Sequence, residues 1–291
     1  MESAPNIPPL IAVVGETASG KTALAIELAE RFDGEIICAD SRTVYRNLDI
    51  GTAKPTIEER QRVPHHLLDV VSPDEAFSVA DFKRLAQVAI EDISRRGKVP
   101  LLVGGTGLYI DAILFDYSFS TPANPEERQR LQALSINELQ AEIESHGIPM
   151  PENNRNPRHL MRALETGGTS QEHTSLRENT LILGLHIDRE VLRQKVTRRV
   201  DAMIDAGFIQ EVQNAASKYG WDAPGLRAPG YKAFREYIEG TVTLDQAKVQ
   251  FIRNDMQLAK RQRTWFKRNK SIHWITQQAQ AVDLATTLLN K

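Results

Sequence analysis

Short apolar runs alternate with amphipathic segments over the first hundred residues of the chain. The runs at 10–15 (LIAVVG), 34–40 (GEIICAD) and 98–105 (KVPLLVGG) have the composition and length of buried parallel strands. Residues 21–32 and 79–96 repeat apolar side chains at spacings of three and four, which predicts helices. Strands that alternate with helices in this way predict an α/β fold, with a parallel sheet flanked by helices.

The middle of the chain, residues 118–179, has a different pattern. It is polar, contains five prolines and shows two helical segments, at 126–146 and 157–166. The apolar run at 180–188 then resumes the pattern of a buried strand. We therefore expect residues 118–179 to form a small all-helical insertion in the sheet-containing core.

The core is accordingly predicted to consist of two segments of the chain, 1–117 and 180–291. The second segment is mostly helical after its strand, because apolar residues recur there at helical spacing. The helices predicted in this segment are 189–206, 208–218 and 244–268.

The composition is that of an ordinary globular protein, with 41% hydrophobic and 25% charged residues. Cys38 is the only cysteine, so no disulfide can form within the chain, which fits a reducing compartment. The first residues lack the pattern of a signal peptide, and no apolar run approaches the ~18 residues of a membrane span. We therefore expect a cytoplasmic monomer that makes no membrane contact.

The net charge of −2 conceals an uneven distribution. Counting Lys, Arg, Asp and Glu gives −6 for residues 1–120, −3 for 121–180 and +7 for 181–291. A basic final third on an acidic body predicts that one face of the protein meets a polyanion.

The stretch GETASGKT, residues 15–22, fits the pattern G-x-x-x-x-G-K-[ST] in full and lies between a predicted strand and helix. Its glycines let backbone N–H groups surround phosphate oxygens, and the helix N-terminus adds a positive dipole. Lys21 supplies a mobile positive charge, and the Thr22 hydroxyl is suited to hold Mg²⁺. Such loops commonly bind ATP and other nucleotides, so the loop predicts a polyphosphate ligand without identifying it.

Asp40 ends the second predicted strand, at the edge of a parallel sheet where ligands bind. A carboxylate in this position is suited to act as general base toward an acceptor group. The alternative is that Asp40 caps the turn that begins with SRTVY. The third strand ends in Val103-Gly104-Gly105-Thr106, without the Mg²⁺-directing aspartate of many P-loop ATPases. This favours a group-transfer enzyme over a motor-type NTPase.

Several stretches together resemble one family, the tRNA dimethylallyltransferases, also called isopentenyl-tRNA transferases. They are GETASGKT, DSRTVYRNLDIGTAKP, PHHLLDVVSPDEAFSVADF, VGGTGLYI, RRVDAM, GYK and AKRQRTWF. The resemblance extends from about residue 10 to residue 274, nearly the whole chain. The blocks are jointly very specific, whereas the phosphate loop alone is not.

The resemblance implies a P-loop NTPase-like sheet and transfer of a dimethylallyl group from its diphosphate to an adenosine beside the tRNA anticodon. The loop would then hold the leaving diphosphate rather than ATP, with Mg²⁺ on Thr22. The catalytic residues implied are Asp40, Thr22, Lys21 and Arg199. The diphosphate-binding residues implied are Gly15, Thr17, Ala18, Ser19, Gly20, Lys21 and Thr22. Without the resemblance, Arg199 would be compatible with a solvated helix face.

The resemblance also implies a tRNA-binding surface, in which the insertion clamps the anticodon stem-loop and the target base is flipped out of its stack. The tRNA-binding residues implied are Asp40, Ser41, Arg42, Thr43, Thr106, Arg128, Arg158, His159, Arg162, Arg227, Gly230, Tyr231 and Lys232. The basic stretch 253–270 is suited to phosphate contact. We expect its aromatic residues, Trp265 and Phe266, to pack mainly in the core.

The chain departs from the family pattern at a few positions. Glu16 replaces a proline in the phosphate loop, and we expect its side chain to point outward. His159 and Met256 replace arginines, Pro229 replaces an aliphatic residue, and Arg155 begins a pair that is often Asn-Asp. These changes concern the RNA side more than the phosphate side.

Three other functions are compatible with parts of the sequence. One is a small-molecule P-loop kinase with Asp40 as base, against which the basic final third argues. Another is dimethylallyl transfer to a free adenine nucleotide, for which the insertion would be unnecessary. A non-catalytic RNA-binding protein is the third, and it would not need an intact loop together with Asp40.

Overall fold

The computed structural model describes residues 7–117, 124–168 and 175–290. The chain divides into two compact units, one made of residues 1–114 and 176–291 and the other of residues 115–175. The insertion predicted from the sequence, 118–179, begins three residues later and ends four residues later than the second unit.

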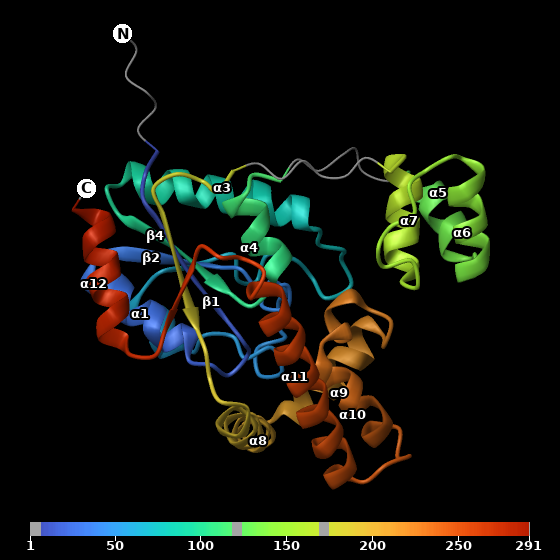
Figure 1. Ribbon diagram of the computed structural model, residues 1–291. Coiled ribbons are helices and arrows are strands. Elements are labelled where there is room, and N and C mark those ends of the chain that lie inside the picture. Colours follow the sequence, from blue (N-terminus) through green and yellow to red (C-terminus); the bar gives the residue numbers. More distant parts are fainter. Residues whose placement is uncertain (1–6, 118–123, 169–174, 291) are drawn as a thin grey trace. The chain divides into compact units, whose positions relative to one another are not determined.

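The larger unit is built on a parallel sheet, and the predicted α/β class is confirmed (Figure 1). Its described strands follow the order β3-β2-β4-β1-β5-β6, and every neighbouring pair is parallel. β1 lies inside the sheet and is buried along its whole length, which explains its unbroken apolar sequence. The strands are β1 (Leu10–Gly15), β2 (Gly34–Cys38), β3 (His65–His66), β4 (Val99–Gly104), β5 (Thr180–Leu185) and β6 (Ile272–Ile275).

Helices cover this sheet and also form a second layer at its C-terminal end (Figure 1). Helices α1 and α12 pack on one apolar core with the strands, through residues such as Leu24, Leu28 and Ala281. A second apolar core joins α8, α9, α10 and α11 around Phe208, Phe234 and Phe251. The helices of the unit are α1 (Lys21–Arg31), α2 (Ile57–Arg62), α3 (Val79–Arg95), α4 (Gly107–Leu114), α8 (Arg189–Asp205), α9 (Phe208–Tyr219), η1 (Pro224–Arg227), α10 (Pro229–Ile238), α11 (Leu244–Phe266) and α12 (Gln278–Leu289).

The carboxyl ends of β2 and β4 lie unusually close together. A Cβ atom on Gly104 would lie 2.0 Å from the carbonyl oxygen of Ala39, so only glycine fits there. The residues that follow these two strands, Asp40 and Gly105, are therefore brought to one edge of the sheet.

The smaller unit is helical and has its own apolar core. Its helices are α5 (Pro125–Gln132), α6 (Ile136–Ser145) and α7 (Pro157–Thr166). The prediction of one helix over 126–146 was wrong, because Ser135 ends the first segment and caps the second. Its hydroxyl accepts from the Glu138 N–H, and the Glu138 carboxylate accepts from the Ser135 N–H at 2.7 Å, which forms a capping box.

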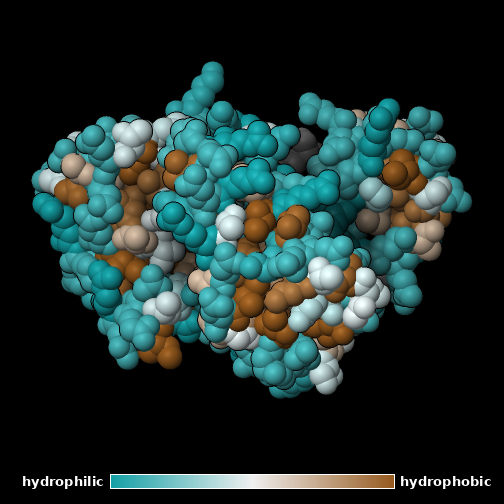
Figure 2. Space-filling model, turned by 90° about the horizontal axis from the view of Figure 1, so that it is seen from below, coloured by the Kyte–Doolittle hydropathy of each residue, from teal (hydrophilic) through white to brown (hydrophobic). Residues whose placement is uncertain are grey.

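On the face shown in Figure 2, hydrophilic residues surround separate apolar patches. Within the part of the chain that the structure describes, no helix is long and apolar enough to cross a membrane.

Candidate functional site

A cavity of about 410 Å³ opens at the carboxyl edge of the sheet in the larger unit. The phosphate loop, the segment after β2, a turn at residues 51–53 and helices α8 and α11 all contribute to its wall. The residues predicted for the site that line it are Thr17, Ala18, Ser19, Gly20, Lys21, Thr22, Asp40, Arg42, Thr43 and Arg199. Parts of the chain that are distant in sequence thus place the predicted phosphate-side and acceptor-side groups in one cavity.

The phosphate loop has the backbone that its glycines suggest. Gly15, Ala18 and Gly20 have φ values of 151°, 59° and 97°, and a Cβ atom on Gly15 would lie 2.9 Å from the Leu185 carbonyl oxygen. Helix α1 begins at Lys21 with no side-chain cap on its first amides. The Ser19 hydroxyl is buried and makes no hydrogen bond within the described protein. These unmatched donors at a helix N-terminus fit a phosphate group.

Lys21 lies between the loop and Asp40. Its Nζ donates to the Glu16 carbonyl oxygen at 2.5 Å. The pKa of Lys21 is lowered to about 8, mainly by burial and also by the nearby Arg199, while the carboxylates of Asp40 and Glu16 oppose the shift. An added anion would raise the pKa of Lys21, because further negative charge stabilises the protonated form.

Arg199 extends from α8 to the phosphate loop. Its Nη1 donates to the Thr17 hydroxyl at 2.8 Å, and its Nη2 donates to Asp255 at 2.5 Å. The Asp255 carboxylate is buried, and that burial raises its pKa although Arg199 opposes the change. The Nε of Arg199 is buried without a hydrogen-bond partner in the described protein. The structure thus brings Arg199 beside the loop, in the position that the resemblance implied.

Glu16 does not point outward, so that expectation was wrong. The side chain is buried and forms a two-point ion pair with Arg263 of α11, in which Nη2 lies 2.9 Å from Oε2. Arg263 is therefore partly buried and paired with a carboxylate, rather than free on the basic surface that the stretch 253–270 suggested. The carboxylate of Glu16 neutralises a guanidinium instead of facing the phosphates.

Gln262 makes a second link between the phosphate loop and α11, and the sequence analysis did not assign it a role. It is buried, accepts from the Thr17 N–H at 2.8 Å and donates to the Gly105 carbonyl oxygen at 3.0 Å. Its position in the block AKRQRTWF was the available signal. As expected, Phe266 is buried, and Trp265 is partly buried and donates from Nε1 to Asp111 at 2.7 Å.

Asp40 combines the two interpretations offered by the sequence. One oxygen, Oδ1, accepts from the Arg42 N–H at 2.8 Å, which is the bond of an aspartate that caps a turn. The side chain nevertheless lines the cavity that contains Lys21. The next residue, Ser41, donates its N–H to the Thr106 hydroxyl at 3.0 Å, so Thr106 lies beside this segment.

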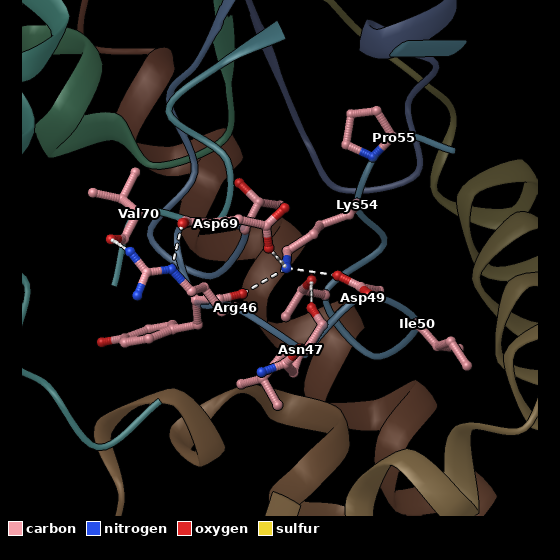
Figure 3. Close-up of polar contacts among 12 residues, drawn as sticks. Arg46, Asn47, Asp49, Ile50, Lys54, Pro55, Asp69 and Val70 are labelled. Carbon is pink, nitrogen blue, oxygen red and sulfur yellow. Dashed lines mark hydrogen bonds and ion pairs between the residues drawn. The ribbon is translucent and has the colours of Figure 1, made fainter. Parts of the chain in front are cut away.

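The turn at residues 49–54 is held by a buried lysine (Figure 3). The Nζ of Lys54 lies 2.5 Å from the Tyr45 carbonyl oxygen, 2.7 Å from Asp49 and 2.5 Å from Asp69. These contacts join the block DIGTAKP to the block PHHLLD, which are separate stretches of the sequence.

Glu211 of α9 supports the same turn from its other side. Its carboxylate accepts from the N–H groups of residues 49, 50 and 51 at 2.7, 2.8 and 2.9 Å. The Tyr231 hydroxyl donates a fourth hydrogen bond, at 2.5 Å. A single carboxylate therefore fixes the backbone that carries Gly51 and Thr52 to the cavity wall.

Tyr231, one of the residues that the resemblance implies for tRNA binding, lies in the interior of the larger unit. It is fully buried among aromatic residues and bonded to Glu211, so it acts inside the protein. Gly230 is also buried, and a Cβ atom there would lie 2.6 Å from the Phe251 ring. Their neighbours Arg227 and Lys232 are exposed.

The remaining predicted RNA contacts lie in the smaller unit. Arg128 belongs to α5, and Arg158, His159 and Arg162 belong to α7. Arg128, Arg158 and His159 are exposed, and Arg162 is partly buried.

A metal ion at the phosphate loop would have few protein ligands. Among the described residues, no three His, Cys, Asp or Glu side chains form a group that could hold one. Thr22 and Asp40 line the same cavity, and such oxygen donors fit Mg²⁺, which usually retains waters and shares phosphate oxygens. The donor set is therefore compatible with Mg²⁺ bound through Thr22 together with a diphosphate.

Comparison with known proteins identifies relatives of this chain. The sequence model of the family described as IPP transferase matches residues 43–269. A tRNA dimethylallyltransferase from Anoxybacillus flavithermus is 42% identical over 277 residues, which cover 91% of this chain and 89% of the relative.

Two solved structures are also similar. The tRNA isopentenylpyrophosphate transferase of Bacillus halodurans is 36% identical, with a TM-score of 0.74 and coverage of 97% of this chain and 96% of its own. A eukaryotic dimethylallyltransferase, whose structure was solved acting on tRNA, is 27% identical, with a TM-score of 0.77. The match covers 92% of this chain and 73% of the eukaryotic chain.

Proposed function

The chain belongs to the IPP transferase family and is a tRNA prenyltransferase, and we propose that the adenosine it modifies lies next to the anticodon. It transfers a dimethylallyl group from dimethylallyl diphosphate to an adenosine of tRNA. We further propose that the exocyclic amine of that base is the acceptor and that the insertion clamps the anticodon stem-loop. The monomeric state and the cytoplasmic location stay predictions.

One observation carries the assignment of the site. The phosphate loop, Arg199 and Asp40 line the same cavity, so a leaving group and an acceptor base can be bound within one space. The Ser19 hydroxyl and the Arg199 Nε, both buried and without a partner among the described residues, are donors that a diphosphate would satisfy.

The reaction forms a bond between the amine nitrogen and the allylic carbon, and it breaks the bond between that carbon and the diphosphate oxygen. Negative charge develops on the departing oxygen, where Lys21, the loop amides and Arg199 would neutralise it. Mg²⁺ held through Thr22 would supply further charge neutralisation when bound. Asp40 would orient the amine and accept its proton as the new bond forms.

The fixed turn at residues 49–54 supports this mechanism by its position. Lys54 and Glu211 hold its backbone, so the cavity wall near Thr52 keeps its place when the flipped base enters. Exclusion of water from the cavity would strengthen the charge interactions at the diphosphate.

The acceptor is the point that separates this function from its alternatives. The protein would be given dimethylallyl diphosphate with an anticodon stem-loop and AMP side by side, and the modified adenosines would be identified by mass spectrometry. We expect the prenyl group on the stem-loop, at the adenosine next to the anticodon. Prenylated AMP would instead indicate a free-nucleotide acceptor, and ATP-dependent phosphorylation of a small molecule would indicate a kinase.

A further inference from the structure

A buried carboxylate joins two arginines in the smaller unit. Glu165, near the end of α7, has a side chain that is only 3% exposed. Its two oxygens lie 3.1 and 3.5 Å from Nη1 of Arg128, which comes from α5. Nη1 of Arg162, one turn earlier on α7, lies 3.5 Å from Oε2 of the same carboxylate. One buried anion therefore fixes two cations from two helices.

The arginines remain available to a ligand although they share this anion. Their side chains are 49% and 38% exposed, and a guanidinium has five N–H donors. Within the described part of the unit, each arginine contacts Glu165 through its Nη1 atom only. Both guanidiniums can therefore bind phosphate oxygens while Glu165 restricts their orientation.

We propose that Glu165 is a positioning residue for RNA, which holds Arg128 and Arg162 at a fixed separation so that each binds a backbone phosphate of the anticodon stem-loop. This proposal rests on the proposed function, because it takes tRNA as the polyanion that the two arginines meet. It assigns a role to a residue that itself repels RNA.

That repulsion makes the proposal testable, since charge and positioning predict opposite results. Glu165→Gln keeps the size of the side chain but makes the surface more positive by one charge. If only charge mattered, RNA would bind more tightly and with at least as steep a salt dependence. If Glu165 positions the arginines, their contacts are lost and binding weakens although the net charge is more favourable.

The experiment is a titration of the full-length protein with a fluorescent anticodon stem-loop at several salt concentrations. We expect Glu165→Gln to weaken binding about tenfold and to lower the slope of log K against log salt by about one. Glu127→Gln is the matched control, because Glu127 is an exposed carboxylate of α5 that pairs with Arg130. This control should change the affinity less than about twofold. Unchanged or tighter binding by the Glu165→Gln protein would overturn the proposal.

The same change, made in a protein that already lacks both arginines, distinguishes positioning from misfolding of the insertion. In the Arg128→Gln/Arg162→Gln protein, the added Glu165→Gln change should cost no further affinity, because the groups that it positions are absent. If the added change still weakens binding several-fold, Glu165 acts on the whole insertion and the positioning role is wrong. If the Arg128→Gln/Arg162→Gln protein binds RNA as tightly as the wild type, the proposed RNA contact itself fails.

Discussion

The carboxylate of Glu16 and the guanidinium of Arg263 form a two-point ion pair between the phosphate loop and α11. Arg263 also donates to the Ile187 carbonyl oxygen at 3.3 Å, just after β5. The loop is thus tied to a helix that begins more than two hundred residues later. Its geometry depends on these distant contacts as well as on its own glycines.

Glu16→Gln should lower both stability and affinity for dimethylallyl diphosphate. The change leaves the partly buried Arg263 without its charged partner, and hydrogen bonds to charged groups are worth ~1.5–3 kcal/mol. We therefore expect the free energy of unfolding to fall by about 1–2 kcal/mol, since Arg263 is partly exposed, and the KM for the diphosphate to rise. Urea unfolding and steady-state kinetics measure the two effects. Arg261→Gln, at an exposed position of α11, is the control and should change neither.

Asp40→Ala should abolish transfer while leaving the fold and diphosphate binding intact. The carboxylate lines the cavity beside Lys21, and loss of a general base typically costs ~10²–10⁴-fold in rate. Single-turnover transfer to the anticodon stem-loop measures the rate, and calorimetry measures diphosphate binding. A rate within threefold of wild type would remove Asp40 from the catalytic residues.

Arg199→Ala should slow the departure of the diphosphate. A preorganised donor of this kind is often worth ~3–4 kcal/mol in the transition state, about 10²–10³-fold in rate. The variant also leaves Asp255 buried without its charged partner, so Arg199→Ala/Asp255→Asn is needed as a comparison. If the second change restores stability but not the single-turnover rate, the loss is catalytic. Recovery of the rate would mean that Arg199 serves only to neutralise Asp255.

The pKa of Lys21 predicts two opposite responses to alkaline pH. Its pKa is lowered from 10.5 to about 8, so between these values the unfolded chain binds more protons than the folded protein. The contribution of this group to the free energy of unfolding therefore rises with pH across that window. Affinity for the diphosphate, which is fully ionised above about pH 7, should fall above pH 8, because the ammonium loses its proton.

Lys21→Arg separates this titration from all others. Arginine stays charged throughout the range, so the variant should lose both responses. Calorimetric titrations and urea unfolding between pH 7 and pH 10 measure them. An affinity that stays constant over this range in the wild-type protein would show that Lys21 remains protonated.

Glu211→Gln should destabilise the protein strongly, although the two side chains have almost the same shape. The carboxylate accepts four hydrogen bonds, and an amide would place its own N–H₂ group against at least one backbone donor. We expect the free energy of unfolding to fall by about 2–4 kcal/mol, whereas Tyr231→Phe removes one bond and should cost about 1 kcal/mol. Equal stability of the Glu211→Gln and wild-type proteins in urea would contradict the role of Glu211.

The parts of the fold that were predicted are those with a local signal. β1 is predicted by an unbroken apolar run. α1 is predicted by the glycines before it and by apolar residues that recur at spacings of three and four. By contrast, β3 has only two residues and α10 begins at the Ala228-Pro229 step, so neither carries a periodic pattern long enough to detect. The break between α5 and α6 depends on Ser135, whose capping box with Glu138 begins a new helix inside a stretch of helical composition.

The site was predictable where short sequence motifs contain the functional residues, as they do for Lys21 and Asp40. It was not predictable where a partner lies far away in the sequence. Nothing next to Glu16 indicates that Arg263 will neutralise it, and an unpaired carboxylate is reasonably expected to face water. The burial of Tyr231 was not predictable for the same reason, since it depends on residues of α9 and α11.

The order of contacts has a consequence for the synthesis of the protein. Thr17 and Glu16 are supported by residues 245 and 247 positions later in the chain. At a translation rate of ~5–20 residues per second, roughly 12–50 seconds separate the appearance of the phosphate loop from that of its support. A nascent chain that stops before α11 contains the whole loop sequence but none of these contacts. Such fragments should therefore hold the diphosphate poorly, and the growing polypeptide acquires its activity only after α11 has been synthesised.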